Sequence, residues 1–514
     1  MLHLPGARRQ SLLCFVVLLL VVGSLSLVHA QDAELGFEEW DCPFPEIDGV
    51  VCGYLTVPED RSQPDGSVVE LAVAIISPVN EDADPVPVIY LEGGPGEAPL
   101  ISIDAFLSEP IVEDHTLILF DQRGTGFSTP SLNCWEIEED DGSSDTVQDC
   151  RDRLESEGVN LQMYNSAASA ADVYDLVTAL GYDQVNLWGI SYGTKLGLTI
   201  LRDYPEIVQS AVLDSVYAPE TDDLQIQTYG LLDSLNLLFA TCADDSVCSD
   251  AYPSLEDDFY ALLEQLDNDP VTIDYDGEEV TLDSATVLQS LFLTLYDMNA
   301  IPFLPYGINL LAYAESDDDY VEGYGIISDN ELPITPDEPP AVIDPVADSD
   351  LVVDYTDEYG DIADSEGMAY SVDCQEEYQL DDLDAAFSLA EDAPEPLSTY
   401  FVDGINSNVE SCDTWGVETA DSIEAERVES DVPTLLFAGS FDPITPVSSA
   451  ESALEGLTNG TLLVFPTAGH GITFTYNDAG ECAKTLMLDF LNDPSAPLDT
   501  QCIDDTGYID FYVG

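Results

Sequence analysis

The chain has 514 residues, 45% of them hydrophobic, so it can bury a large core and is not disordered throughout. Ten lysines and arginines stand against 103 aspartates and glutamates, which gives a formal net charge of −93. Such a surface repels nucleic acid and anionic membranes, so neither is an expected partner. The acidity predicts a protein suited to saline surroundings. The alternatives are an extracellular enzyme kept soluble by its charge, or calcium binding, although no EF-hand spacing occurs.

The first 30 residues resemble an export signal. Arg8 and Arg9 precede an apolar run over 12–28, and 28–30 has the small-residue pattern of a signal-peptidase site. We expect cleavage after Ala30, a secreted or extracytoplasmic protein, and no membrane association afterwards. An uncleaved membrane anchor is the alternative, because the apolar run is marginally long enough to span a bilayer.

Strands and helices alternate up to about residue 215. Short apolar, β-branched segments predict strands, and apolar residues at helical spacing predict helices. In chain order these are strands at 68–77, 86–92 and 116–121, a helix at 167–180, a strand at 185–189, a helix at 194–204 and a strand at 211–214. This alternation predicts an α/β fold with a mostly parallel, doubly wound sheet.

The pattern changes after about residue 219. Segments such as 231–240 and 284–296 predict helices, whereas the acidic stretch 315–364 lacks periodicity and predicts a long loop. Strands return at 433–438 and 461–465. We therefore expect a core formed by 31–218 and 429–514, interrupted by a mostly helical insertion, here named the cap, at 219–428.

Cysteine usage agrees with export. Cys14 lies inside the predicted signal, and ten cysteines remain after its removal. An even number in an exported chain predicts disulfides, and pairing between near neighbours is the simplest connectivity. The pairs are Cys42 with Cys52, Cys134 with Cys150, Cys242 with Cys248, Cys374 with Cys412, and Cys482 with Cys502. Zinc is not expected, because the sequence has no C-x-x-C pair and few histidines.

The sequence Gly-Ile-Ser-Tyr-Gly at 189–193 predicts a serine nucleophile. It matches the nucleophile-elbow pattern G-x-S-x-G and stands between a predicted strand and a predicted helix. The glycines allow the sharp turn, so Ser191 projects from it with a helix N-terminus behind. The alternative is a glycine-rich turn that carries an ordinary serine.

A nucleophilic serine needs a base, and two histidines remain once the signal is removed. His115 comes just before a predicted strand, where an edge position is the simpler interpretation. His470 follows the strand 461–465, at the strand end where ligands meet open α/β sheets. We therefore expect His470 to be the base.

The base needs an acid to orient it and to stabilise its charged form. Asp442 follows the strand 433–438 and gives the chain order Ser–Asp–His expected of this fold. Asp214, at the end of the strand after Ser191, is the competing candidate. Backbone N–H groups should hold the oxyanion, one from Tyr192 and one from Gly94, with Gly93 as the second choice.

Five motifs occur in one order along the chain: GGPG at 93–96, DQRGTGFS at 121–128, GISYGT at 189–194, FAGSFDPITP at 437–446 and AGHG at 468–471. Together they resemble the prolyl iminopeptidase and tripeptidyl aminopeptidase branch of the α/β-hydrolases, in particular secreted enzymes with a TAP-like C-terminal domain. The resemblance implies a serine aminopeptidase with no cofactor and no metal. Its substrates would be peptides with a free N-terminus, which lose residues or short peptides through an acyl-enzyme.

The resemblance also implies how substrate is held. A cap narrows the pocket, and acidic residues pair with the substrate's ammonium group; a cysteine followed by acids makes Glu376 or Glu377 the candidate anchor. Glu92 replaces the histidine that precedes GGPG in the iminopeptidases and is expected near the site. Arg123 is expected to brace its loop. An esterase or lipase on the same fold is the alternative function, and a non-catalytic binding protein is a further one.

Overall fold

The computed structural model describes residues 36–45, 47–80, 83–138, 144–328 and 362–514. The predicted signal at 1–30 and most of the predicted acidic loop lie outside these residues. Among the described residues, no helix combines the length and the apolar character needed to cross a bilayer.

Nine described strands form one sheet in the order β1-β2-β3-β5-β4-β6-β7-β10-β11. They are β1 (Phe37–Trp40), β2 (Val50–Pro58), β3 (Val68–Ile76), β4 (Val88–Leu91), β5 (Leu117–Phe120), β6 (Val185–Ile190), β7 (Val208–Asp214), β10 (Thr434–Gly439) and β11 (Gly460–Phe465). The first three pair antiparallel, β3 is antiparallel to β5, and the strands from β5 to β11 are parallel. The predicted α/β class with a mostly parallel sheet is confirmed. β1 and β2 lacked a recognised signal in the sequence.

Helices cover both faces of this sheet. Side chains alternate along each strand, so Leu117 and Leu119 of β5 join one core cluster while Ile118 and Phe120 join the other. The first face packs on α1 (Ile103–Leu107) and α17 (Asp478–Asn492), and the second on α3 (Ser144–Glu157), α4 (Ser166–Leu180), α5 (Tyr192–Asp203) and α16 (Val447–Leu454). Two short helices complete the described core, α2 (Trp135–Glu138) and α18 (Gln501–Asp505).

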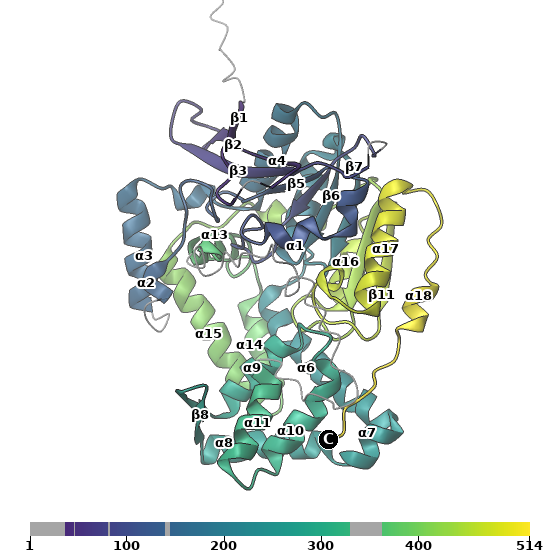
Figure 1. The fold of residues 1–514 in the computed structure, drawn as a ribbon. Helices are drawn as coiled ribbons and strands as arrows, with labels where there is room; N and C mark the ends of the chain where they lie inside the picture. The colour runs from purple at the N-terminus through teal and green to yellow at the C-terminus, as the bar shows by residue number, and fades with distance from the viewer. Residues whose placement is uncertain (1–35, 46, 81–82, 139–143, 329–361) are drawn as a thin grey trace, which may run out of the picture. The chain divides into compact units, whose positions relative to one another are not determined.

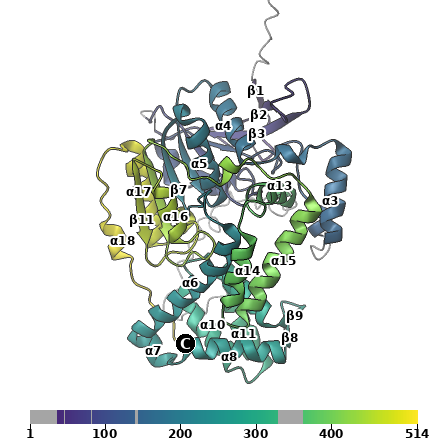
Figure 2. The same cartoon turned by 180° about the vertical axis from the view of Figure 1, so that it is seen from behind.

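A long insertion separates β7 from β10. Its helices are α6 (Asp223–Asp244), α7 (Ser246–Ala251), α8 (Leu255–Asn268), α9 (Ser284–Thr294), α10 (Leu304–Ala312), α11 (Asp317–Ser328), α13 (Glu366–Glu376), α14 (Leu383–Asp392) and α15 (Leu397–Trp415). A hairpin, β8 (Val271–Tyr275) with β9 (Glu278–Leu282), lies among them. Helices α6 to α11 gather on one side of the sheet in both Figure 1 and Figure 2.

Part of the predicted acidic loop is helical, which corrects the expectation for its first section. α11 begins with three aspartates, whose charges suit the positive end of the helix dipole. Ile326 and Ile327 are buried, and Ile326 approaches Gly307 of α10. Tertiary packing therefore stabilises a segment whose composition alone predicted a loop.

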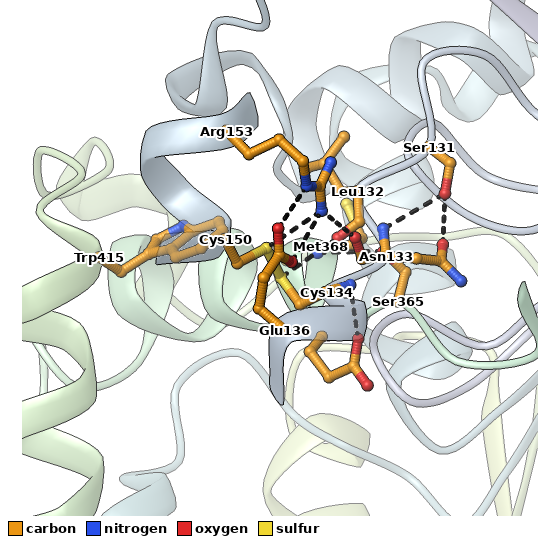
Figure 3. Close-up of a disulfide and its surroundings, with 12 residues drawn as sticks. Ser131, Leu132, Asn133, Cys134, Glu136, Cys150, Arg153, Ser365, Met368 and Trp415 are labelled. Carbon is orange, nitrogen blue, oxygen red and sulfur yellow. Dashed lines mark hydrogen bonds and ion pairs between the residues drawn. A yellow bond between two sulfur atoms is a disulfide. The ribbon is translucent and has the colours of Figure 1, made fainter. Parts of the chain in front are cut away.

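All five predicted disulfides are present, with Cα–Cα distances from 5.1 to 5.7 Å. Figure 3 shows the Cys134–Cys150 bond, beside which Arg153 contacts Glu136 at 2.6 Å. The Cys134 N–H donates to Glu366 at the start of α13 (3.0 Å). This disulfide therefore stabilises the segment of the core on which the cap's α13 is seated.

Candidate active site

Ser191 lies at a sharp turn between β6 and α5. Its backbone adopts φ 52° and ψ −127°, a strained conformation for a residue with a side chain. The flanking glycines are sterically required, because a Cβ on Gly189 would come 2.5 Å from the Gly193 carbonyl oxygen and one on Gly193 would come 2.0 Å from that of Leu91. The predicted elbow is thus present, with Ser191 at the N-terminus of α5.

Ser191 faces a cavity of about 730 Å³, here named the catalytic cavity. This volume suits a small ligand or a short peptide segment. His470 lines the same cavity, as do Tyr90, Phe106 and Phe474 from the aromatic cluster beneath it. No hydrogen bond joins Ser191 Oγ to His470 within the described residues. Such bonds often tighten only when substrate is bound.

His470 is paired with Asp442. Its Nδ1 lies 2.8 Å from Asp442 Oδ2, and Asp442 is 1% exposed. Burial disfavours both charges, but the two groups stabilise one another, so the pKa of His470 is raised and that of Asp442 is lowered. Thr445 helps to hold the carboxylate, since its N–H donates to Oδ1 (2.8 Å) and its hydroxyl to Oδ2 (2.6 Å).

Asp214 does not occupy the place beside the imidazole. Its Oδ2 accepts hydrogen bonds from the N–H and the hydroxyl of Thr473, each at 2.7 Å. The neighbouring Ser215 hydroxyl accepts the Gly471 N–H at 2.8 Å. Asp214 and Ser215 therefore hold the loop after His470, and Asp442 contacts the ring. His115 is buried before β5 and does not line the catalytic cavity.

The cap also contacts the base. The backbone N–H of His470 donates to the Tyr296 carbonyl oxygen (3.1 Å), and the two side-chain rings lie 4.8 Å apart. A Cβ on Gly469 would come 2.4 Å from the Leu295 carbonyl oxygen, so the two segments meet without an intervening side chain. The position of His470 therefore depends on the cap segment that follows α9.

The glycine turn after β4 lies against the serine. A Cβ on Gly93 would come 3.2 Å from Ser191 Cβ, and Gly94 lines the catalytic cavity. Gly93 N–H already donates to Glu92 Oε1 (3.1 Å), whereas neither Gly94 nor Tyr192 N–H has an acceptor in the described part of the chain. Gly94 and Tyr192 are therefore the available pair of donors for an oxyanion.

Glu92 lies in the wall of the catalytic cavity, as predicted for a residue near the site. Burial and the nearby Glu97 carboxylate raise its pKa to about 8. Tyr90 also donates its hydroxyl to Glu92 Oε1, at 2.9 Å. The side chain thus fixes the Gly93 peptide beside the candidate oxyanion donors.

Arg123 braces its loop from a fully buried position. Its guanidinium binds Asp172 of α4 through two nitrogens, each 2.7 Å from an oxygen, and also donates to the Glu59 carbonyl oxygen (3.1 Å). Gln122 donates to the Glu92 carbonyl oxygen (3.1 Å), which ties the same loop to the turn after β4. These contacts agree with a structural role for the arginine.

Glu376 and Glu377 do not line the catalytic cavity, which corrects their predicted role as amine anchors. Both are buried and both pair with Lys195 of α5. Glu376 also accepts hydrogen bonds from the N–H (2.6 Å) and the hydroxyl (2.7 Å) of Ser166. Because their oxygens are occupied within the protein, these carboxylates join α13 to α4 and α5.

Three other cap carboxylates do line the catalytic cavity: Asp364, which is exposed, and a more enclosed pair, Asp223 of α6 and Asp373 of α13. Neither member of this pair forms an ion pair within the described residues. Burial, reinforced by the charge of Asp223, raises the pKa of Asp373 to about 8, and burial raises that of Asp223. The Lys195 ammonium lowers both pKa values, but its ion pairs are with Glu376 and Glu377. Enclosed carboxylates that lack an ion pair of their own form a site that favours a positively charged ligand.

Two family models match the chain. The model described as alpha/beta hydrolase fold matches residues 86–240, and the model described as TAP-like protein matches residues 398–502. The chain is an α/β-hydrolase with a TAP-like C-terminal part. With the residues at the elbow, this makes it a serine hydrolase.

Curated relatives of this hydrolase carry peptidase names. Serine protease Hip1 of Mycobacterium tuberculosis (strain ATCC 25618 / H37Rv) is 24% identical over 463 residues, which cover 83% of this chain and 82% of the relative. Tripeptidyl aminopeptidase of Streptomyces coelicolor is 30% identical over 231 residues, 40% of this chain and 42% of the relative. Probable proline iminopeptidase of the same species is 26% identical over 145 residues, 28% and 37% of the two chains.

Several residues of the hydrolase's cavity were not predicted from the sequence. Thr445 could have been predicted, because it follows Asp442 in the motif at 437–446. Tyr296, Asp223 and Asp373 had no such signal. Two of them are acids among 103, and the third contributes a backbone oxygen that any residue could supply.

Proposed function

We propose that this serine hydrolase is an exopeptidase that releases residues or short peptides from a free N-terminus. The observation that carries the proposal is the catalytic cavity itself. Its lining includes Ser191 and His470 together with Asp223 and Asp373, two carboxylates that form no ion pair within the described residues. An N-terminal ammonium would pair with those carboxylates, and the scissile bond would then lie a short distance along the peptide.

In the proposed reaction, Ser191 Oγ attacks the scissile carbonyl carbon while His470 Nε2 takes the hydroxyl proton. Asp442 stabilises the imidazolium, and the N–H groups of Tyr192 and Gly94 bind the oxyanion. His470 gives its proton to the leaving amine as the C–N bond breaks, which leaves an acyl-enzyme. Water then attacks the ester, and His470 transfers the water's proton back to Ser191.

We also propose that the protein acts outside the cytoplasm. The export-like segment at 1–30 and the five disulfides support this location, because such bonds persist in oxidising compartments. The cap at 219–428 is proposed to restrict the cavity to chain ends. The extreme acidity fits a surface that stays soluble at high salt.

The test uses one peptide sequence in two forms, with a free and with an acetylated N-terminus, and a short acyl ester beside them. Hydrolysis of the free peptide from its N-terminal end, with a loss of at least tenfold in kcat/KM on acetylation, supports the proposal. Fast hydrolysis of the ester with no peptide product would favour an esterase. Failure of a serine-directed phosphonate to label Ser191 would point to a non-catalytic protein.

A further inference from the structure

A second cavity, of about 530 Å³, lies between helices of the cap and opens to the surface; it is here named the cap cavity. It is lined by residues of α6, α9 and α15, the helices that meet below the sheet in Figure 1. Gln227, Tyr378 and Ile444 line both this cavity and the catalytic one. The two spaces are therefore neighbours separated by a single layer of side chains.

Gln227 is the centre of that layer. Its amide nitrogen donates to Asp223 (2.8 Å) on the catalytic side and lies 3.4 Å from the Tyr378 hydroxyl. Its amide oxygen accepts a hydrogen bond from Asn408 (3.0 Å), which lines the cap cavity. One side chain thus joins an acid of the catalytic cavity to the wall of the cap cavity.

The lining of the cap cavity suits an uncharged side chain that can form a hydrogen bond. Phe292, Tyr400 and Phe401 supply aromatic surface, and Asp403 is the one charged residue among the described residues that line it. Thr228 is fully buried at this wall, and its hydroxyl has no partner in the described part of the chain. A buried hydroxyl without a partner is unfavourable, so a ligand that binds it gains from doing so.

We propose that the cap cavity is the subsite for the side chain of the substrate's N-terminal residue, and that Gln227 lies at its entrance from the catalytic cavity. The inference rests on the proposed function, because an ammonium held by Asp223 and Asp373 places the N-terminal residue beside Gln227. The ammonium is a charged donor and forms a stronger bond to Asp223 than the Gln227 amide does. Its arrival frees Gln227 to move, and a large side chain then enters the cap cavity. The subsite favours tyrosine over phenylalanine, through the hydroxyl of Thr228.

Gly404 of α15 offers a way to fill the cap cavity. It lines the cavity, and a Cβ at this position would meet no atom within 4 Å. Gly404 is exposed, so Gly404→Leu introduces a side chain at the open mouth of the cavity without a clash, and leucine is also the better helix former. Thr228→Val keeps the shape of the wall and removes only the hydroxyl. Gln227→Ala removes the side chain at the entrance of the cap cavity. Gln225→Ala, on the same helix but outside both cavities, is its matched control.

The experiment measures kcat/KM for free peptides that differ only in their N-terminal residue: glycine, phenylalanine or tyrosine. Gly404→Leu should lower the values for phenylalanine and tyrosine about tenfold relative to glycine. Gln227→Ala should raise both relative to glycine, and Thr228→Val should abolish the preference for tyrosine over phenylalanine. Gln225→Ala should change none of these ratios. Melting temperatures identify any variant that fails to fold, and Thr228→Val then carries the test.

The acetylated peptides separate the two proposals. Suppose that acetylation greatly slows wild-type hydrolysis, but that Gly404→Leu and Thr228→Val leave unchanged the kcat/KM ratios of phenylalanine to glycine, tyrosine to glycine and tyrosine to phenylalanine. The subsite assignment is then wrong and the proposed function stands. If acetylation has no effect, the free N-terminus is not recognised, and both proposals are wrong.

Discussion

The catalytic cavity has a core half and a cap half, and the two are built in different ways. In the core half, Ser191, Asp442 and His470 each follow a parallel strand, and their positions are set by the backbone. In the cap half, Asp223 and Asp373 lie on helices, and their character depends on Lys195 forming its ion pairs with Glu376 and Glu377 and not with them. Backbone constraints leave motifs in a sequence. The surroundings of one carboxylate among many do not.

The largest expected effect concerns the core half. Ser191→Ala should lower kcat by about 10⁶-fold, because the residues of a triad act as a unit and only binding and the oxyanion donors remain. The yield of folded protein and the melting temperature should stay near those of the wild type. Near-normal turnover in this variant would remove Ser191 as the nucleophile.

The second prediction compares two aspartates of the core half. Asp442→Asn should lower kcat by about 10⁴-fold, because the imidazole loses its orienting acid. In the wild type, Asp442 raises the pKa of His470 above the ordinary histidine value of 6.5. The acidic limb of the pH–activity profile, where activity rises as His470 loses its proton, should therefore lie above pH 6.5. Asp442→Asn should move that limb to lower pH. Asp214→Asn should shift the profile less. A larger shift in Asp214→Asn than in Asp442→Asn would mean that Asp214 is the acid that acts on His470.

The third prediction compares two carboxylates of different kinds, Asp373 on α13 and Glu377 just after it. Asp373→Asn should raise KM for free peptides about tenfold or more, because the ammonium loses a desolvated partner. Glu377→Gln should leave KM unchanged and should lower stability by about 1–3 kcal/mol, since it weakens a buried contact with Lys195. Steady-state kinetics and thermal melts of both variants make the comparison. A KM effect in Glu377→Gln alone would restore the anchor role expected from the sequence.

The fourth prediction concerns pH and the cap half. Asp373 has a pKa of about 8, so below that pH it holds a proton and pairs weakly with an ammonium. The substrate's α-amine loses its own proton at about 7.7–8.0. KM for free peptides should therefore pass through a minimum near pH 8 and rise on either side. In Asp373→Asn the rise on the acidic side should shrink, and an unchanged profile would exclude this aspartate.

The smallest expected effect concerns the acidic outer surface of the protein, to which both the core and the cap contribute. At a net charge of −93, exposed carboxylates repel one another. Raising sodium chloride from 0.1 M to 1 M shortens the screening length from about 10 Å to 3 Å, so the melting temperature should rise. A flat response would mean that paired charges or bound calcium already offset the repulsion, and sensitivity to a chelator at constant ionic strength would identify calcium.

The same division explains what the sequence could predict. Buried parallel strands are continuous apolar runs, so β4, β5, β6 and β10 were recognisable, and the elbow at Ser191 needs glycines that a pattern can capture. His470 followed from the scarcity of histidines. Local spacing also sufficed for the cysteine pairs, since each joins neighbours along the chain.

The cap was less predictable, because its roles depend on long-range packing. Glu376 and Asp373 lie three positions apart on α13, yet one contacts Ser166 and Lys195 while the other faces the cavity. The contacts of Glu376 with Ser166 on α4 and Lys195 on α5 distinguish the two residues. Likewise, α11 is stabilised by its contacts with α10, which composition does not reveal.

The most direct test of the account combines both halves in one measurement, the ratio of kcat/KM for a free peptide to that for its acetylated form. The wild type should favour the free peptide by at least tenfold, and the double variant Asp223→Asn/Asp373→Asn should bring the ratio close to one while a short acyl ester is still hydrolysed. A ratio that remains high in the double variant would contradict the assignment of the cap acids as the anchor of the N-terminus.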